Sequence, residues 1–328
     1  MTVVRSLLML GWTAILAACP VVAQAQPQPQ PWPSRPLRVL VPFTPGGSVD
    51  SIARVVGAKL QEFIGQPVII ENKPGVGGNL AADLVAKSSP DGYTILQNPV
   101  GQTMSPSLYK SLPYDTEKHL APVTQLIESA LLLVATPKLP ANDLRELLAL
   151  ARARPGELNS GNTGVGNPLH LAMEMLTRAT DIKIQGVAFR GDAPIMTALM
   201  GGDIQVAIFP AATGIPAVEG GQVKALAVST ARRIRFLPNV ATIAEQGVPG
   251  FAADSWQGWW VPAGTPREIV ERLAAEARKA LTSPDVRQRM DGLSADVVAS
   301  TPAEFAAKVK EDIAKYAKIV KEANIPLQ

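Results

Sequence analysis

Short runs rich in β-branched residues alternate with longer amphipathic stretches along most of this chain, and this alternation restricts the fold more than any other feature. Residues 37–43, 67–71 and 93–96 have the composition of buried strands. The stretch after the first of them places an apolar face at helical spacing: Ile52, Val55, Val56, Leu60 and Phe63. Strands that alternate with helices predict an α/β fold that begins with a parallel sheet and right-handed crossovers.

A second series of the same kind begins at residues 131–136. Its expected elements are helix 142–154, a Gly- and Asn-rich loop at 160–167, helix 169–179, strand 184–189, helix 193–200, and strands 205–209 and 224–228. After Gly250 the chain becomes an extended segment with three tryptophans, followed by helices. Helix 266–281 has proline in its first turn, and Thr301 and Glu304 form a capping box for the last helix.

The order of these elements predicts two lobes. Lobe 1 comprises residues 36–128 plus 251–328, and lobe 2 comprises residues 129–250, so that the helical tail returns to lobe 1. A Pro/Gln-rich tether at residues 26–35, with little capacity to fold, precedes them.

The N-terminus has the pattern of an export signal over residues 1–25. Arg5 precedes an apolar stretch at residues 6–18, which is shorter than the roughly 20 residues of a membrane-spanning helix. Cleavage after Ala25 is favoured, and the alternative is a lipidated N-terminus at Cys19. Since no later stretch approaches spanning length, we expect a soluble mature protein in an exported compartment.

Composition excludes several classes of protein. The 31 Lys and Arg residues nearly balance 28 Asp and Glu, for a net charge of +3, and no basic stripe exists that would bind nucleic acid. Cys19 is the only cysteine, so a chain cleaved after Ala25 has no disulfide, thiol nucleophile or thiolate metal site. Hydrophobic residues make up 47% of the chain, enough for a sizeable core without such crosslinks.

Three glycine-bearing segments lie where strands are followed by helices, at residues 43–50, 72–79 and 160–167. A helix start leaves peptide N–H groups unpaired, and glycine lets a ligand approach them closely, so such segments bind carboxylates and phosphates. Each segment alone is typical of a structural turn. Together they favour one shared anion-binding cleft. Asp50 is expected to cap the first helix, with a second role in receiving a ligand ammonium or hydroxyl group.

Motifs for catalysis and cofactors are absent from the sequence. No segment has the lysine of a P-loop, the spacing of a dinucleotide fingerprint or a nucleophile elbow. His170 and Glu174 are four residues apart on one helix face, as metal pairs are, but no third ligand is nearby. Arg190 is either a partner for a ligand carboxylate or a solvated loop residue. We therefore expect no catalytic residue, no metal and no cofactor.

Five stretches together resemble the Bug-type substrate-binding proteins of tripartite tricarboxylate transporters. They are PFTPGGSVD, PVIIENKPGVGGNLAADLVAKSSPDGYTIL, SGNTGVGNPLHLAMEML, VAFRGDAPIMTALMGGDIQVAIF and IAEQGVPGFAADSWQGWWVPAGTP. The resemblance runs from about Pro36 to the C-terminus. It implies the two-lobed fold of periplasmic binding proteins (type II-like), with two crossovers between lobes and a cleft that closes on a small carboxylate.

The resemblance also implies a set of ligand-binding residues, held mostly through backbone amides. The implied residues are Phe43, Thr44, Gly46, Gly47, Asp50, Ser160, Gly164, Val165, Gly166, Asn167, His170, Phe189 and Arg190. Gly75, Gly77 and Gly78 match the family's second glycine turn, where a structural role is expected. Asn167, Phe189, Arg190 and Asp192 depart from the residues common in the family, which leaves the identity of the carboxylate open.

The function implied is that of a monomeric periplasmic protein that binds a small organic anion and delivers it to two membrane transporter subunits. Two alternatives remain at this stage. One is a sensor or adaptor that reports ligand occupancy to a membrane signalling protein. The other is an exported hydrolase or lyase, for which no nucleophile or metal constellation is visible.

Overall fold

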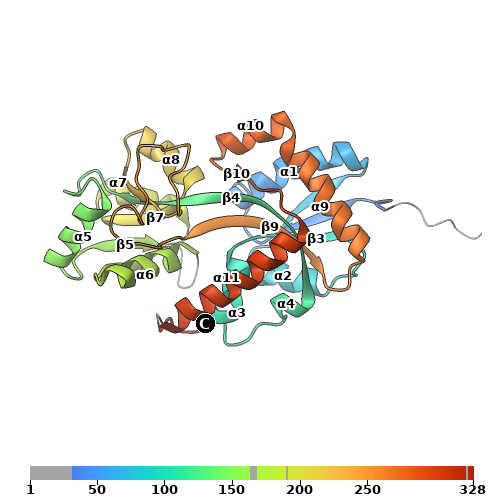
Figure 1. Cartoon of the computed structure of the whole chain (residues 1–328), viewed down its shortest axis with the longest axis horizontal. Coiled ribbons are helices and arrows are strands. Elements are labelled where there is room, and N and C mark those ends of the chain that lie inside the picture. Colours follow the sequence, from blue (N-terminus) through green and yellow to red (C-terminus); the bar gives the residue numbers. More distant parts are fainter. Residues whose placement is uncertain (1–31, 163–167, 190, 323) are drawn as a thin grey trace, which may run out of the picture. The chain divides into compact units, whose positions relative to one another are not determined.

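Ten strands form one hydrogen-bonded network in the computed structural model, which describes residues 32–162, 168–189, 191–322 and 324–328 (Figure 1). The strand order is β2-β1-β3-β9-β4-β7-β5-β6, and β8 and β10 also pair with β4. The strands are β1 (Leu37–Val41), β2 (Val68–Asn72), β3 (Thr94–Pro99), β4 (Leu120–Ala135), β5 (Asn159–Asn162), β6 (Gln185–Ala188), β7 (Val206–Pro210), β8 (Lys224–Val228), β9 (Asp254–Pro262) and β10 (Asp296–Val297).

Helices pack against this network. They are α1 (Ser48–Ile64), the 3₁₀ turn η1 (Val76–Gly78), α2 (Asn79–Ala86), α3 (Gly101–Leu108), α4 (Thr116–His119), α5 (Leu144–Ala153), α6 (Pro168–Thr180), α7 (Asp192–Gly201), α8 (Ala211–Glu219), α9 (Arg267–Thr282), α10 (Pro284–Gly292) and α11 (Pro302–Glu322). The mixed sheet with its helices confirms the predicted α/β class.

The first three strands are parallel, as predicted. β1 lies between β2 and β3, with Val39 opposite Ile70 and Ile95. The apolar face of α1 is buried at Ile52, Val56 and Leu60, but Phe63 is 44% exposed and was wrongly assigned to that face. Phe63 lies instead on the outer surface, where the Lys59 ammonium is 5.7 Å from its ring centroid.

Strand β4 is longer than the sequence pattern indicated, because residues 120–130 extend it ahead of the predicted 131–136. Over its first part β4 pairs antiparallel with β9, from Leu120 opposite Pro262 to Ala130 opposite Asp254. From Leu131 onward it pairs antiparallel with β7, and with β8 along the other edge. Figure 1 shows β4 and β9 side by side. These two strands therefore provide the two crossovers that the resemblance implied.

The second series contains a parallel group, in which β5 pairs with both β6 and β7. Residues 160–162, predicted as part of a loop, are instead the end of β5. The glycine in this strand has a packing reason, since a Cβ on Gly161 would lie 2.5 Å from Ile195 and 2.6 Å from Ile204. Helix α8 was missed because Gly214 and Pro216 lie inside it.

The C-terminal elements pack on the first series. The rings of Trp256, Trp259 and Trp260 in β9 are fully buried, and Phe305 of α11 meets Trp256 edge-on with ring centroids 5.3 Å apart. The predicted capping box of α11 is present. Thr301 N donates to a Glu304 carboxylate oxygen over 2.8 Å, and Glu304 N donates back to Thr301 Oγ1 over 3.2 Å.

The tether is ordered at its described end. The indole of Trp32 donates to the carbonyl of Asp91 over 3.0 Å, and the amide of Ser34 donates to the Tyr93 hydroxyl over 2.9 Å. The four residues from Trp32 onward are thus anchored beside β3 rather than free. The predicted export signal and residues 26–31 lie outside the described residues. None of the described helices combines the length and the apolar run that crossing a bilayer takes.

Candidate functional site

The carboxyl end of β1 leads into an exposed turn and then into α1. Gly46, with φ of +88°, has a backbone conformation that residues with a Cβ rarely adopt, and Gly47 is the extended N-cap of the helix. The first helical hydrogen bond runs from Ser51 N to Gly47 O over 2.9 Å. The peptide N–H groups of the three residues before Ser51 therefore have no acceptor within the helix, and the positive end of the helix dipole lies among them.

The Asp50 side chain stabilises the conformation of this turn through hydrogen bonds. Its side chain is 3% exposed and accepts hydrogen bonds from Gly46 N (3.0 Å), Arg54 Nε (3.0 Å) and Asn72 Nδ2 (2.9 Å). Asn72 Nδ2 also donates to the carbonyl of Phe43 over 2.9 Å. Burial acts to raise the pKa of the Asp50 carboxyl, but the hydrogen bonds from Arg54, Gly46 and Asn72 outweigh burial and hold that pKa below its ordinary value.

Two expectations for this turn change as a result. Asp50 is not the N-cap of α1, because the helix begins at Ser48 and Asp50 lies in its first turn. The Gly46 amide already donates to Asp50, so it is not an open donor for a ligand. At Gly47, by contrast, a Cβ would meet nothing closer than the carbonyl of Thr44 at 3.9 Å. The space beside Gly47 is therefore open to a guest.

A row of buried amides joins the first turn of α1 to β3 and β9. Trp259 Nε1 donates to Gln97 Oε1 over 2.9 Å, and Gln97 Nε2 donates to Val49 O over 3.1 Å and to Gln257 Oε1 over 2.9 Å. Gln257 Nε2 is in turn 3.1 Å from Ser48 Oγ. Gln97, Gln257 and Ser48 were not among the residues predicted for the site. The available signal was a pair of polar residues, Gln97 followed by asparagine, inside an otherwise apolar strand.

The second glycine segment is packed against protein. A Cβ on Gly77 would lie 2.6 Å from the Tyr109 hydroxyl, and one on Gly78 would lie 3.2 Å from Pro42 Cβ and 3.3 Å from Asn98 Oδ1. Both glycines also have positive φ, 64° and 103°. The close contacts and the backbone conformation together account for glycine at these positions, in keeping with the structural role expected there.

The segment between β5 and α6 is partly outside the described residues, which leaves out Gly164, Val165, Gly166 and Asn167. Ser160, at 3% exposed, is within β5. His170 lies in the first turn of α6, with Nε2 3.8 Å from a Glu174 carboxylate oxygen. Burial lowers the pKa of His170 more than Glu174 raises it, so the imidazole is neutral near pH 7.

The turn between β6 and α7 adjoins the end of β5, because Phe189 N donates to Asn162 O over 2.8 Å. Arg190 lies outside the described residues. Asp192 is the first residue of α7, and burial raises the pKa of its carboxyl. Asp50 offsets the same desolvation cost with hydrogen bonds from Arg54, Gly46 and Asn72.

The start of α6 approaches the carboxyl end of β3. A Cβ on Gly101, the first residue of α3, would lie 4.0 Å from Pro168 Cγ at the start of α6. Leu171 packs into the same hydrophobic cluster as Trp256 and Leu40. The structure therefore brings the described part of the β5–α6 segment next to the strand edge that carries the α1 turn. It also brings Phe189 to the end of β5.

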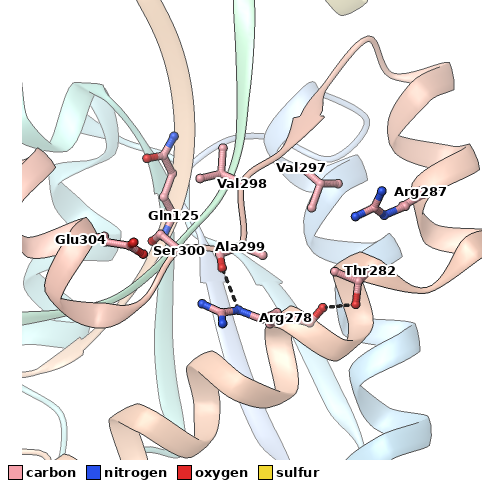
Figure 2. A pocket seen from close by; sticks show the side chains of 9 residues that line it. All are labelled: Gln125, Arg278, Thr282, Arg287, Val297, Val298, Ala299, Ser300 and Glu304. Atoms are coloured by element: carbon pink, nitrogen blue, oxygen red, sulfur yellow. Dashed lines mark hydrogen bonds between the residues drawn. The ribbon is translucent and has the colours of Figure 1, made fainter.

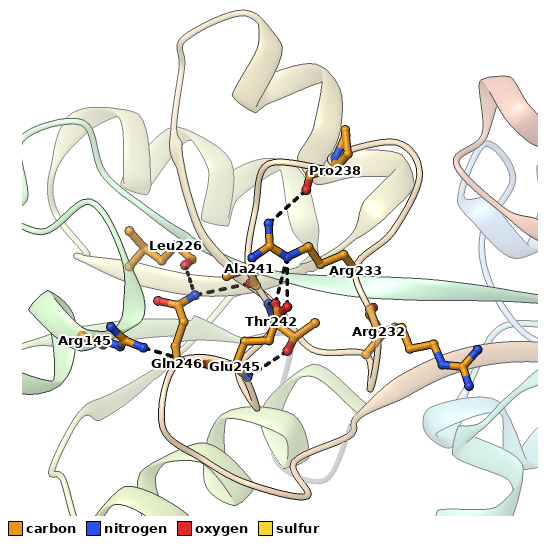
Figure 3. Close-up of polar contacts among 10 residues, drawn as sticks. Arg145, Leu226, Arg232, Arg233, Pro238, Ala241, Thr242, Glu245 and Gln246 are labelled. Atoms are coloured by element: carbon orange, nitrogen blue, oxygen red, sulfur yellow. Dashed lines mark hydrogen bonds and ion pairs between the residues drawn. The ribbon is translucent and has the colours of Figure 1, made fainter.

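Three cavities lie elsewhere. The first, of about 470 Å³, lies between α9, α10 and the start of α11 and has Arg278 and Arg287 on its wall (Figure 2). The second, of about 370 Å³, is lined by the ion pair of Arg233 and Glu245 and by Gln246, whose side chain donates to Leu226 O over 2.9 Å (Figure 3). Of the predicted ligand residues that the structure describes, none lines either of them.

A third cavity, of about 480 Å³, lies beside Glu128, Ser129 and Ala130 of β4. Arg235 on its wall forms ion pairs with Asp291 of α10 and Asp296 of β10. It likewise contains none of the predicted ligand residues. Among the described residues there is also no cluster of three or more His, Cys, Asp or Glu side chains that could hold a metal ion. The β1–α1 turn is therefore the best-formed candidate for an anion site.

Comparisons with known proteins agree with one another. A family model described as tripartite tricarboxylate transporter family receptor matches residues 52–325. Protein BugT of Bordetella pertussis is 33% identical over 299 residues, covering 90% of this chain and 92% of that protein. Rpa4515 of R. palustris, solved with adipate, is 34% identical with a TM-score of 0.83, covering 90% of this chain and 100% of the other.

MatC from Rhodopseudomonas palustris, solved with bound malate, is 34% identical with a TM-score of 0.79 and covers 88% of this chain and 100% of the other. These similarities extend over nearly the whole described chain. They confirm the predicted fold of the periplasmic binding proteins.

Proposed function

We propose that this chain, which belongs to the family of tripartite tricarboxylate transporter receptors, captures a small dicarboxylate in the periplasm and delivers it to membrane transporter subunits. As a member of that family it is a periplasmic solute-binding protein. The finer assignment rests on one observation. The first turn of α1 presents unpaired peptide N–H groups beside an open glycine, while a buried carboxylate holds the turn in place.

The chemistry of this turn suits an anion and needs no charged side chain in contact with it. A dissociation constant near 1 μM requires about 8 kcal/mol. Hydrogen bonds to a charged group contribute about 1.5–3 kcal/mol each. Donors at the α1 turn, together with those of the β5–α6 and β6–α7 turns, would supply this, less the cost of immobilising the ligand. Two relatives that bind adipate and malate support a dicarboxylate.

Closure would bring the two sets of turns together. In this proposal lobe 1 is residues 36–128 plus 251–328, and lobe 2 is residues 129–250. The hinge lies where β4 exchanges β9 for β7 as its partner, between Ala130 and Leu131. The ligand-binding residues proposed are those named from the sequence, with Gly46 and Asp50 acting by holding the turn rather than by touching the ligand.

A binding panel tests the ligand class. Protein freed of co-purified ligand is titrated calorimetrically with malate, adipate, an amino acid and an aromatic acid, and its melting temperature is followed in parallel. We expect at least one dicarboxylate to bind and to stabilise the fold, because a ligand at 100 times its dissociation constant adds about 2.7 kcal/mol. No binding by any dicarboxylate would overturn the proposal.

A matched pair of variants at Gly47 tests the location of the site. Both Gly47→Asn and Gly47→Asp introduce a favourable N-cap, so the melting temperature should be unchanged or higher. The new side chains compete with the ligand for the same amides, and only the aspartate adds repulsion. We expect about tenfold weaker binding for Gly47→Asn and no measurable binding for Gly47→Asp. Unaltered affinity in Gly47→Asp would remove this turn from the site.

A further inference from the structure

We infer that Ser48 determines the specificity of the proposed site, because a directed chain of hydrogen bonds, buried at its Trp259 end, holds its hydroxyl as a donor. In this role Ser48 selects a carboxylate, which only accepts hydrogen bonds, over the corresponding carboxamide. The inference rests on the proposed function. It adds a residue and a selection rule that do not follow from glycine turns or from the helix dipole.

The direction of the chain is set at its buried end. The indole N–H of Trp259 can only donate, so the Gln97 atom 2.9 Å from it is the amide oxygen. The amide nitrogen of Gln97 then faces the carbonyl of Val49, which can only accept, at 3.1 Å. Two neighbours with opposite requirements thus fix the same orientation of the Gln97 side chain. Gln97 is fully buried, so water offers it no other partner.

That orientation is passed on toward the site. Gln97 Nε2 donates to Gln257 Oε1 over 2.9 Å, which places the Gln257 nitrogen at the other end, 3.1 Å from Ser48 Oγ. Gln257 is 4% exposed, so its side chain is also held away from bulk water. The nitrogen can only donate, and Ser48 Oγ must accept. One lone pair of the hydroxyl is engaged, and its proton is free to be donated elsewhere.

Ser48 is placed to use that proton on a ligand. It is the first residue of α1 and is half-buried beside the exposed Gly46 and Gly47. The neighbouring peptide groups at this helix start are donors as well. The group that docks here therefore meets donors from the backbone and from the side chain. A carboxylate oxygen satisfies them, whereas the NH₂ of a carboxamide would face donors with its own hydrogens.

The first experiment compares acid and amide ligands. Adipate and its monoamide adipamate, and malate and its monoamide malamate, are titrated into wild type, Ser48→Ala and Ser48→Thr. We expect wild type to prefer the dicarboxylate, Ser48→Ala to lose about tenfold or more in dicarboxylate affinity and much less in monoamide affinity, and Ser48→Thr to restore the preference. An unchanged preference in Ser48→Ala overturns this inference alone. A wild type that binds no dicarboxylate overturns it together with the proposed function.

The second experiment tests the chain itself. In Gln257→Glu an acceptor replaces the nitrogen that faces Ser48, so the hydroxyl must turn and donate inward. We expect the dicarboxylate preference to collapse. Because the new charge also repels anions, the double variant Ser48→Ala/Gln257→Glu serves as the control. If Gln257 acts through Ser48, the effect of the glutamate is smaller in the alanine background. Equal effects in both backgrounds would mean that Gln257 does not orient Ser48.

Discussion

The β1–α1 turn and the β6–α7 turn both follow parallel strands and both place an aspartate in the first turn of a helix. Their carboxylates differ. Asp50 accepts hydrogen bonds from a backbone amide, a guanidinium and an asparagine, and its pKa is held below the ordinary value. Burial alone raises the pKa of Asp192. Hydrogen bonds thus offset the cost of burying Asp50, whereas in the described part of the chain burial is the effect that acts on Asp192.

This difference in hydrogen bonding predicts different roles for the Asp50 and Asp192 carboxylates. A carboxylate whose bonds are all made inside the protein fixes backbone geometry and has little left to offer a ligand. A buried carboxylate with few hydrogen-bond partners takes up a proton more readily, and its charge acts more strongly on a nearby anion. We therefore expect Asp50 to maintain the geometry of the β1–α1 turn, and we expect removal of the Asp192 charge to change ligand affinity.

Removing the compensated carboxylate should have the largest effect. Asp50→Ala leaves the Gly46 amide and the Asn72 side chain without their acceptor, so we expect the free energy of unfolding to fall by about 2–3 kcal/mol and dicarboxylate affinity to fall with it. Urea unfolding and calorimetry measure the two effects. Asp285→Ala is the matched control, because that side chain is 60% exposed and should cost at most about 0.5 kcal/mol. Equal losses in the two variants would contradict the supporting role of Asp50.

The glycine before α1 and the glycine within β5 differ in the space around them. At Gly161 of β5 an added Cβ would overlap Ile195 and Ile204, whereas the space at Gly47 is open. Gly161→Ala should therefore lower the free energy of unfolding by about 1–3 kcal/mol, measured by denaturant unfolding. Gly292→Ala, with no atom within 4 Å of the new Cβ, is the control and should change it by at most about 0.5 kcal/mol. If Gly161→Ala is as stable as the control, then β5 and its neighbours accommodate the added methyl group without strain.

Changes at Asp192 should have the smallest effect on ligand affinity. Asp192 has a raised pKa in the folded protein, so it takes up a proton as the pH falls, and its repulsion of a bound anion is lost. Wild-type affinity for the dicarboxylate should rise as the pH falls from 8 toward the raised pKa of Asp192. Asp192→Asn should bind about threefold to tenfold more tightly at pH 8. Calorimetry across this pH range compares the two proteins.

The same proton uptake makes a stability prediction with a definite sign. The folded protein holds the Asp192 proton more tightly than the unfolded chain does, so acidification through the raised pKa favours folding at this position. Asp192→Asn lacks this contribution. If the affinities of wild type and Asp192→Asn change in parallel with pH, a group other than Asp192 causes the pH dependence.

Local sequence patterns predicted the elements whose conformation is determined by their own neighbouring residues. Strand β8 has the predicted bounds, and the Thr301–Glu304 capping box opens α11 as expected. The family resemblance, which used the combination of motifs rather than any single one, is confirmed by the family model and the relatives. The strand and the capping box are encoded within a few neighbouring residues, so the sequence alone carries them.

Other features depend on partners that are distant in the chain. The first part of β4 contains Pro122, Gln125 and Glu128, which do not suggest a strand, yet pairing with β9 imposes one. Gly161 resembles a loop residue until the two isoleucines that press on it are known. The Gln97–Gln257–Ser48 chain joins residues up to 209 positions apart, so no local pattern could have indicated it.

The pairing of β4 with β9 limits how this molecule can change shape. The two strands are paired from Leu120 opposite Pro262 to Ala130 opposite Asp254, with register shifts between Pro122 and Thr124 and between Gln125 and Ile127. Neither strand can slide along the other without breaking this ladder. The ribbon that they form is joined by β3 on the β9 side and by β10 on the β4 side over part of its length, which resists shear further. Motion between its ends is therefore restricted to flexing of the ribbon as a unit, and a substitution in one strand alters the stiffness felt by both.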